Sequence, residues 1–148
     1  MAHVKRDILI QSPPAAVYSI ARDPNRWSTW FANLSGPERL EGDGSVGTVG
    51  HYTYKMAGVP MSVKVTVLED SSSPAGCRWV GRVEGAITAE QTFVYAPEGG
   101  GTRLTVEIDY TVPGGGLGKL ADKLVMERFN EQSADQTLEA LKRLCEGA

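Results

Sequence analysis

Apolar and polar residues alternate along several segments of the chain, with a period of two. Residues 61–67 read MSVKVTV, and residues 103–112 read RLTVEIDYTV. Residues that favour turns recur between such segments, at positions 41–47, 57–60, 70–76, 83–86 and 96–101. Alternation with closely spaced turns is typical of antiparallel strands that have one buried face and one solvated face. The pattern therefore predicts a meander of six strands, each joined to the next by a hairpin.

A further strand and two short helices are predicted before this meander. Residues 3–11 have a strand pattern. Ser12 can cap a helix whose first position is Pro13, where the missing N–H of proline costs nothing. A second short helix follows, and it carries Trp27 and Trp30 on one face because they are three residues apart.

A long helix is predicted for residues 117–145, about 40 Å in length. Its apolar stripe at 100° per residue comprises Leu120, Leu124, Ala134, Leu138, Leu141 and Cys145. Three polar residues fall within the same stripe, namely Glu127, Asn130 and Glu131. Val125 and Phe129 fall on the opposite side of the helix. That side would be an apolar patch suited to a partner protein or to a homodimer.

Together these elements predict one α+β domain spanning residues 1–148. A large meander twists strongly, so its apolar face becomes concave, and only the last helix is long enough to cover that face. We expect a curved seven-stranded antiparallel sheet wrapped around the long C-terminal helix, with the two short helices closing one end. The glycine-rich stretch 113–119 fits no phosphate-binding motif well, and it is interpreted as the corner that swings the helix across the sheet.

Composition and charge indicate which kinds of partner and cofactor are not expected. Hydrophobic residues make up 41% of the 148 residues and charged residues 22%, with a net charge of −3 and no basic cluster beyond Lys5-Arg6. We expect neither nucleic acid nor an integral membrane segment. Cys77 and Cys145 are isolated and fit a reduced cytoplasmic protein. The two histidines have no metal-ligand spacing, so neither a metal nor a cofactor is expected.

Three stretches resemble the helix-grip superfamily (Bet v 1-like, START-related, SRPBCC), in particular its polyketide cyclase/dehydrase-like branch. They are IQSPPAAVYSIARDPNRWSTWF at residues 10–31, GTRLTVEIDY at 101–110, and VPGGGLGKLADKL with LEALKRLCEG at the C-terminal end. The resemblance implies a hydrophobic cavity between sheet and helix that holds a lipid, quinone, polyketide or similar molecule. Some members catalyse cyclisation or dehydration, and others act through protein partners. The central stretch RWVGRVEGAITAEQTF departs from the aromatic-ring cyclases, so no catalytic residue carries over.

Strand parity and the helical stripe identify candidate ligand-binding residues. From the strands these are Tyr52, Tyr54, Val63, Val65, Trp79, Gln91, Phe93, Val106, Ile108 and Tyr110, and from the helix Leu120, Leu124, Glu127 and Asn130. The tyrosines could anchor a ligand, or they could be core aromatics bonded to backbone or water. Trp27, Trp30 and Phe31 could gate the cavity or simply pack on the core.

Catalytic candidates are Glu127, Glu131 and Tyr110. A buried carboxylate could act as an acid or base near neutral pH, whereas carboxylates that reach water or pair with an arginine would have no such role. Three functions therefore remain open. The first is binding of a hydrophobic small molecule, the second is a cyclase/dehydratase-type enzyme using Glu and Tyr, and the third is a protein-interaction module.

Overall fold

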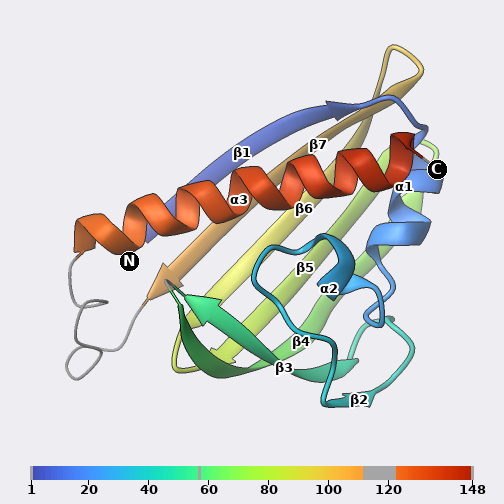
Figure 1. Ribbon diagram of the computed structural model, residues 1–148. Helices are drawn as coiled ribbons and strands as arrows, with labels where there is room; N and C mark the ends of the chain where they lie inside the picture. Colours follow the sequence, from blue (N-terminus) through green and yellow to red (C-terminus); the bar gives the residue numbers. More distant parts are fainter. Residues whose placement is uncertain (1, 57, 112–122, 148) are drawn as a thin grey trace.

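The chain forms a strand, two short helices, six further strands and a long helix (Figure 1), and this computed structural model describes residues 2–56, 58–111 and 123–147. The strands are β1 (Ala2–Ile10), β2 (Arg39–Glu41), β3 (Val49–Met56), β4 (Val59–Ser73), β5 (Gly76–Gly85), β6 (Thr88–Glu98) and β7 (Gly101–Thr111). The helices are α1 (Pro14–Ala21), α2 (Trp27–Trp30) and α3 (Lys123–Glu146). The predicted glycine corner at residues 113–119 lies outside the described residues.

All seven strands pair antiparallel in one sheet, in the order β1-β7-β6-β5-β4-β3-β2. Strands β2 to β7 follow one another in space as they do in the chain, which confirms the predicted meander. The first strand pairs with the last, so that Ala2 lies opposite Tyr110 and Ile10 opposite Thr102. A register shift between Val67 and Glu69 in β4 marks a bulge, which increases the local twist of the sheet.

The two faces of the sheet differ in the way that the alternation predicts. Met61, Val63, Val65 and Val67 in β4 are all buried on the inner face. The outer face carries pairs of opposite charge between neighbouring strands, such as Lys64 with Glu84 in β5 at 3.6 Å. Such exposed pairs contribute little free energy, but they keep the outer face polar.

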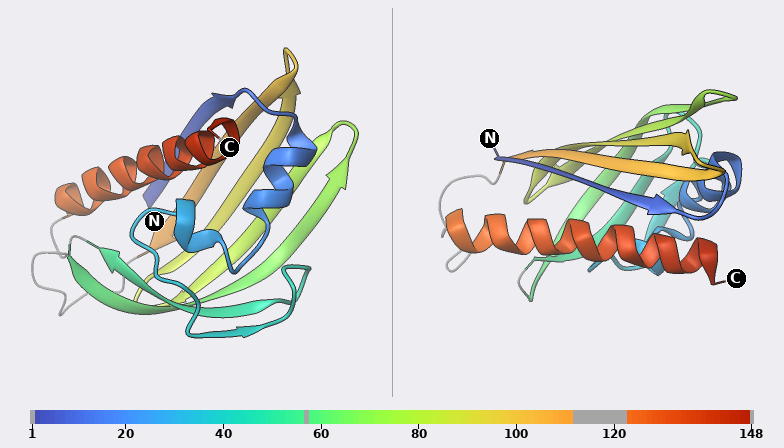
Figure 2. Two further views of the ribbon diagram at one scale, coloured as in Figure 1. Left: turned by 45° about the vertical axis from the view of Figure 1, so that its right-hand side comes forward. Right: turned by 90° about the horizontal axis from the view of Figure 1, so that it is seen from above.

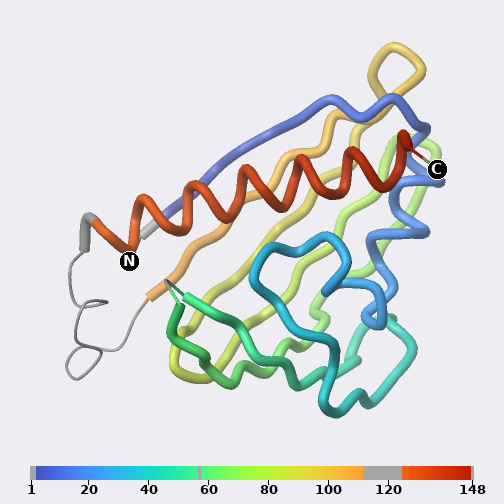
Figure 3. The backbone as a smooth tube through the Cα atoms, in the orientation of Figure 1, coloured from blue at the N-terminus to red at the C-terminus, as the bar shows by residue number. Residues whose placement is uncertain are grey.

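Helix α3 forms a second layer across the concave side of the sheet, as the view from above in Figure 2 shows. It runs alongside β1 (Figure 3) and is held to that strand by polar contacts. The Lys142 ammonium donates to the carbonyl oxygen of Leu9 at 2.8 Å, and the Gln11 N–H donates to the Glu146 carboxylate at 2.6 Å. The C-terminal end of α3 is thereby fixed to the end of β1.

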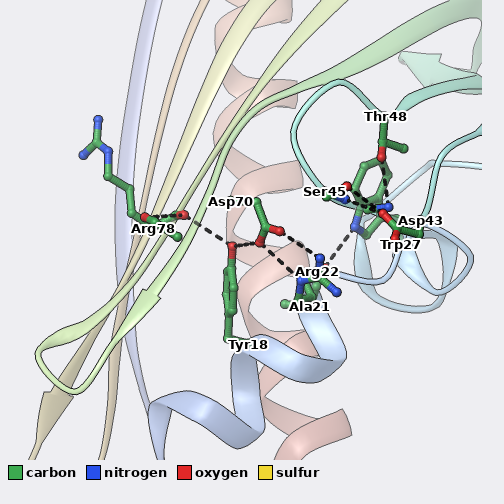
Figure 4. Close-up of polar contacts among 11 residues, drawn as sticks. Tyr18, Ala21, Arg22, Trp27, Asp43, Ser45, Thr48, Asp70 and Arg78 are labelled. Carbon is green, nitrogen blue, oxygen red and sulfur yellow. Dashed lines mark hydrogen bonds and ion pairs between the residues drawn. The ribbon is translucent and has the colours of Figure 1, made fainter.

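Helix α1 begins one residue later than predicted. Pro14 occupies the first turn and Pro13 is the cap residue, while no side chain caps the helix. The prediction that Ser12 is the cap was therefore wrong, because the second proline of the pair, rather than the first, takes the position that needs no N–H. The C-terminal end of α1 is tied to the sheet by polar contacts of Tyr18 and Arg22 with Asp70 in β4 (Figure 4).

Candidate functional site

A cavity of about 90 Å³ lies between the inner face of the sheet and helices α2 and α3. Its apolar lining comes from every strand between β3 and β7 and from both helices. The lining residues are Ala21, Trp27, Trp30, Phe31, Leu34, Tyr54, Met56, Val63, Val65, Trp79, Val83, Ile87, Ala89, Gln91, Phe93, Tyr95, Val106, Ile108, Tyr110, Asn130, Ser133, Ala134 and Thr137. A volume of this size exceeds the roughly 10–15 Å³ that one water needs, and is below the roughly 300–1,000 Å³ of drug-sized pockets.

Aromatic side chains form the end of the cavity nearest the two short helices. The rings of Trp27 and Trp79 meet edge to face at 5.4 Å between centroids, and Trp79 meets Phe93 in the same manner at 5.8 Å. Trp30 lies edge to face on Phe93 at 5.9 Å. Trp27 and Trp30 are each 5% exposed, so both tryptophans pack on the core and also line the cavity.

Polar groups on α3 hold the helix against α2 and β3. The Tyr54 hydroxyl lies 3.3 Å from Ser133 Oγ, within hydrogen-bond distance. The hydroxyl of Thr137 accepts a hydrogen bond of 3.0 Å from the N–H of Ala32, just after α2. Ser133 and Thr137 are both buried. These contacts place two small polar residues, rather than leucines, at the centre of the helix face that meets the cavity.

Tyr110 and Asn130 bring polar groups together at the far end of the cavity from the tryptophans. Tyr110, near the end of β7, is 4% exposed. Burial raises the pKa of its phenol, while the neighbouring Asn130 side chain acts in the opposite direction, and Glu127 and Glu131 raise the pKa through their negative charge. Burial likewise raises the pKa of Tyr54. Both phenols are therefore neutral and able to donate hydrogen bonds at neutral pH.

The structure places most of the candidate ligand-binding residues on the cavity wall. Those that line it are Tyr54, Val63, Val65, Trp79, Gln91, Phe93, Val106, Ile108, Tyr110 and Asn130. Tyr52 does not, because its hydroxyl donates to the carbonyl oxygen of Pro24 at 2.9 Å and its ring packs on Trp27. The side chains of Leu120 and Leu124 lie outside the described part of the structure.

The two candidate catalytic glutamates do not line the cavity. Glu131 is turned towards β1, where its carboxylate lies 3.2 Å from Arg6, and about half of its side chain is exposed. Arg6 also contacts Asp135, one turn further along α3, at 3.2 Å. Glu127 is partly buried but is not a lining residue. Of the two alternatives left open for Glu131, the structure shows the pairing with an arginine, because a cation on the neighbouring strand holds the carboxylate at the edge of the helix.

Phe129 is on the opposite side of α3 from the one predicted. Its ring meets Tyr54 edge to face at 6.5 Å and packs on the core cluster around Met56 and Tyr110. Val125 is 44% exposed. Of the two residues in the predicted apolar patch, only Val125 therefore lies on the surface, because Phe129 packs on the core. The predicted buried face of α3 was placed wrongly because only apolar residues were used to find it. Ser133 and Thr137, which are buried, were not included.

Arg6 is the residue that the sequence reasoning missed. Arg6 lies on the same face of β1 as Val4, Ile8 and Ile10. These three residues belong to the two core clusters or pack against them. A cation at an inward position of a strand requires a partner of opposite charge. This was the available signal that acidic residues of the last helix would face β1 instead of the cavity.

Two further features of the described residues bear on the expected partners. No helix within the described residues is both long and apolar enough to cross a membrane. In the same part of the chain, no three His, Cys, Asp or Glu residues lie together in a way that could hold a metal ion.

Solved structures of the same architecture cover almost the whole chain. TTHA0849 from Thermus thermophilus is 22% identical with a TM-score of 0.78, over 99% of this chain and 98% of that one. The Zhui aromatase/cyclase from Streptomyces sp. R1128 is 17% identical with a TM-score of 0.79, over 98% and 93%. A START superfamily protein from Mycobacterium smegmatis is 20% identical with a TM-score of 0.65, over 98% and 94%.

At these identities the likeness to solved structures establishes the fold alone. No protein with a curated description matches the sequence significantly. The family model described as "Polyketide cyclase / dehydrase and lipid transport", however, matches residues 1–146. The helix-grip fold, its inner cavity and this match agree with one another, and the chain belongs to the polyketide cyclase/dehydrase and lipid transport family.

Proposed function

We propose that this protein binds a hydrophobic small molecule in the cavity between the sheet and α3. The observation that carries the proposal is the composition of the cavity wall, which is aliphatic and aromatic with a few polar groups. Such a wall suits an apolar ligand that is oriented by a small number of hydrogen bonds. Membership of a family described by cyclases, dehydrases and lipid transport supports the same ligand class.

The cavity volume limits the ligand to a small molecule unless the walls move. A cavity of about 90 Å³ is smaller than the roughly 150 Å³ that holds one benzene ring, so a compound of one or two fused rings needs a small outward movement of α3. A larger lipid or polyketide would need α3 to stand further from the sheet. We therefore propose small cyclic compounds as the first probes.

A cyclase or dehydratase activity receives less support from the site. It would need an acid or base at the cavity, and tyrosines are the titratable groups among the described lining residues. A phenol whose pKa is raised by burial can donate a hydrogen bond to a substrate but is a poor proton acceptor at neutral pH. Binding is accordingly the first function to test.

The first test is native mass spectrometry of freshly purified protein, followed by extraction and identification of any bound molecule. The second is titration of ¹⁵N-labelled protein with tetralin, a neutral hydrocarbon of two fused rings, followed by amide chemical shifts. We expect saturable shifts at lining residues such as Ala89 and Val106. A matched variant, Ala134→Phe, fills the cavity from α3 and should abolish them. Shifts that are absent, or equally large in the filled variant, would refute a cavity that binds apolar molecules.

A further inference from the structure

Buried hydrogen-bond donors without a partner are gathered on the cavity wall. Four buried side-chain atoms have no hydrogen bond of ordinary geometry among the described residues, namely Trp30 Nε1, Trp79 Nε1, Tyr110 Oη and Asn130 Nδ2. All four belong to residues that line the cavity. Buried polar groups are nearly always hydrogen-bonded in native proteins, so a cluster of exceptions at one cavity indicates groups reserved for a ligand.

Trp27 provides an internal comparison for the two unpartnered tryptophans. It lines the same cavity and is as deeply buried as Trp30. Its indole N–H nevertheless donates to the carbonyl oxygen of Ala21 at 2.9 Å. The fold can therefore supply a partner to a tryptophan in this region, and it does not do so for Trp30 and Trp79.

The chemistry of these atoms specifies a complementary ligand. An indole N–H and an amide NH₂ can only donate hydrogen bonds, and a phenol can donate as well as accept. The described lining residues include no charged side chain, so a charged ligand would be buried without a counter-ion, which is strongly unfavourable. The wall thus complements a neutral molecule that presents acceptor oxygens.

The donors lie at two ends of the cavity. Trp79 is opposite Phe93, which is opposite Val106 in β7, and Tyr110 is four residues further along that strand. Four residues correspond to about 13 Å at about 3.3 Å per residue. Tyr110 and its neighbour Asn130 therefore form one donor pair, and the tryptophans belong to the opposite end.

We propose that the ligand is a neutral, largely apolar ring compound bearing carbonyl-type oxygens, one of which lies between Tyr110 and Asn130. This inference rests on the proposed binding function and adds the polar chemistry of the ligand. A carbonyl oxygen has two lone pairs, which match two neighbouring donors. The tryptophan N–H groups provide for a second acceptor at the other end of the molecule.

The experiment compares 1-tetralone with tetralin, which have the same two-ring skeleton and differ by one carbonyl group. Dissociation constants are measured by the ¹⁵N chemical-shift titration. Tetralone is the more water-soluble compound, so the hydrophobic effect alone would favour tetralin. We expect tetralone to bind about three- to ten-fold more tightly, the ratio that one net neutral hydrogen bond provides.

Variants identify the donor. Tyr110→Phe and Asn130→Leu should each lower the tetralone-to-tetralin ratio, and together they should bring it to one or below. Tyr52→Phe is the matched control and should leave the ratio unchanged, because the Tyr52 hydroxyl already donates to the carbonyl oxygen of Pro24.

The outcomes separate this inference from the proposed function. Tighter binding of tetralone that disappears in the Tyr110→Phe, Asn130→Leu double variant supports it. Equal or weaker binding of tetralone, with tetralin still saturable, overturns the acceptor chemistry and leaves apolar binding intact. A ratio unchanged in the double variant overturns the assignment to Tyr110 and Asn130. Failure of both compounds to bind overturns the proposed function itself.

Discussion

The hydroxyl of Tyr18 in α1 donates a hydrogen bond of 2.5 Å to the carboxylate of Asp70 in β4. The two residues are 52 positions apart, and the contact fixes the first helix to the rim of the sheet. Arg22, the residue that follows α1, donates to both oxygens of the same carboxylate, at 3.2 and 2.8 Å. Asp70 thus joins two side chains at the C-terminal end of α1, in the neighbourhood of Trp27 (Figure 4).

This arrangement predicts that Asp70→Asn destabilises the protein in a pH-dependent manner. The hydrogen bond from Arg22 lowers the pKa of Asp70 below its ordinary value, more than burial raises it. The stabilisation by the charged carboxylate is therefore present above a pH of about 4 and is lost as the pH falls through the lowered pKa. Urea denaturation at pH 7 should show a loss of about 1–3 kcal/mol.

The same difference between Asp70→Asn and the original protein should shrink as the pH is lowered from 7 to 3. The control is Glu69→Gln, next in the chain, whose carboxylate makes an exposed pair with Arg78. That substitution should change stability by less than about 1 kcal/mol. An Asp70→Asn effect of constant size across this pH range would show that the charge on the carboxylate is not the stabilising feature.

A second prediction concerns Gly81, two residues after Trp79 on the same face of β5. A methyl group at Gly81 would lie 2.3 Å from the nearest atom of the Trp79 indole, so the ring would have to move. Gly81→Ala should lower the free energy of unfolding by about 1–3 kcal/mol through overpacking. Gly36→Ala is the control, since a methyl group there meets nothing within 4 Å. Equal thermal stability of the two variants would contradict the close packing of Trp79 on Gly81.

Thr137→Val tests the contact between α2 and α3. Valine keeps the shape of threonine but cannot accept the hydrogen bond from the N–H of Ala32. The unpaired donor should destabilise the protein by about 1–3 kcal/mol, and hydrogen exchange of the Ala32 amide should accelerate. Thr88→Val in β6, an exposed position, is the matched control. If exchange at Ala32 is unaffected, the hydroxyl of Thr137 does not protect that amide.

The assignment of the two sheet faces is tested by Val65 and Lys64, adjacent residues of β4. Val65 is 6% exposed and lines the cavity, whereas Lys64 lies on the outer face in an exposed pair with Glu84. Val65→Arg would bury a charge without a partner, and should cost more than about 3 kcal/mol or abolish tetralin binding. Lys64→Ala should do little. Comparable damage from both substitutions would mean that the faces are reversed.

The sheet was predictable because the alternation of apolar and polar residues is repeated in several strands. Alternation in residues such as Val63, Val65 and Val67 gives the buried face directly, and the short turns leave few ways to join the strands. The length of the last helix then gave its place, because no other element is long enough to cover the concave face, and the resemblance to the helix-grip superfamily implied the same arrangement. Fold and family were accordingly within reach of the sequence.

The orientation of α3 was harder to predict because it depends on partners that are distant in the chain. Nothing near Glu131 in the sequence reveals that Arg6 is its partner, 125 residues away. Ser133 and Thr137 look like surface residues until Tyr54 and Ala32 are placed beside them. Hydrogen-bond donors without a partner cannot be predicted from the sequence either. Nothing around Trp27 and Trp30 in the sequence indicates that the indole N–H of Trp27 has an acceptor and that of Trp30 has none.

The pairing of β1 with β7 has a consequence for how the chain acquires its structure. Strand β1 leaves the ribosome long before its partner at residues 101–111, so the sheet edge that the two form cannot close until β7 has been made. The strands β2 to β7, in contrast, can pair with their neighbours as they emerge. Contacts between such distant segments slow folding. We expect the nascent meander to form first, with β1 and α3 docking together afterwards.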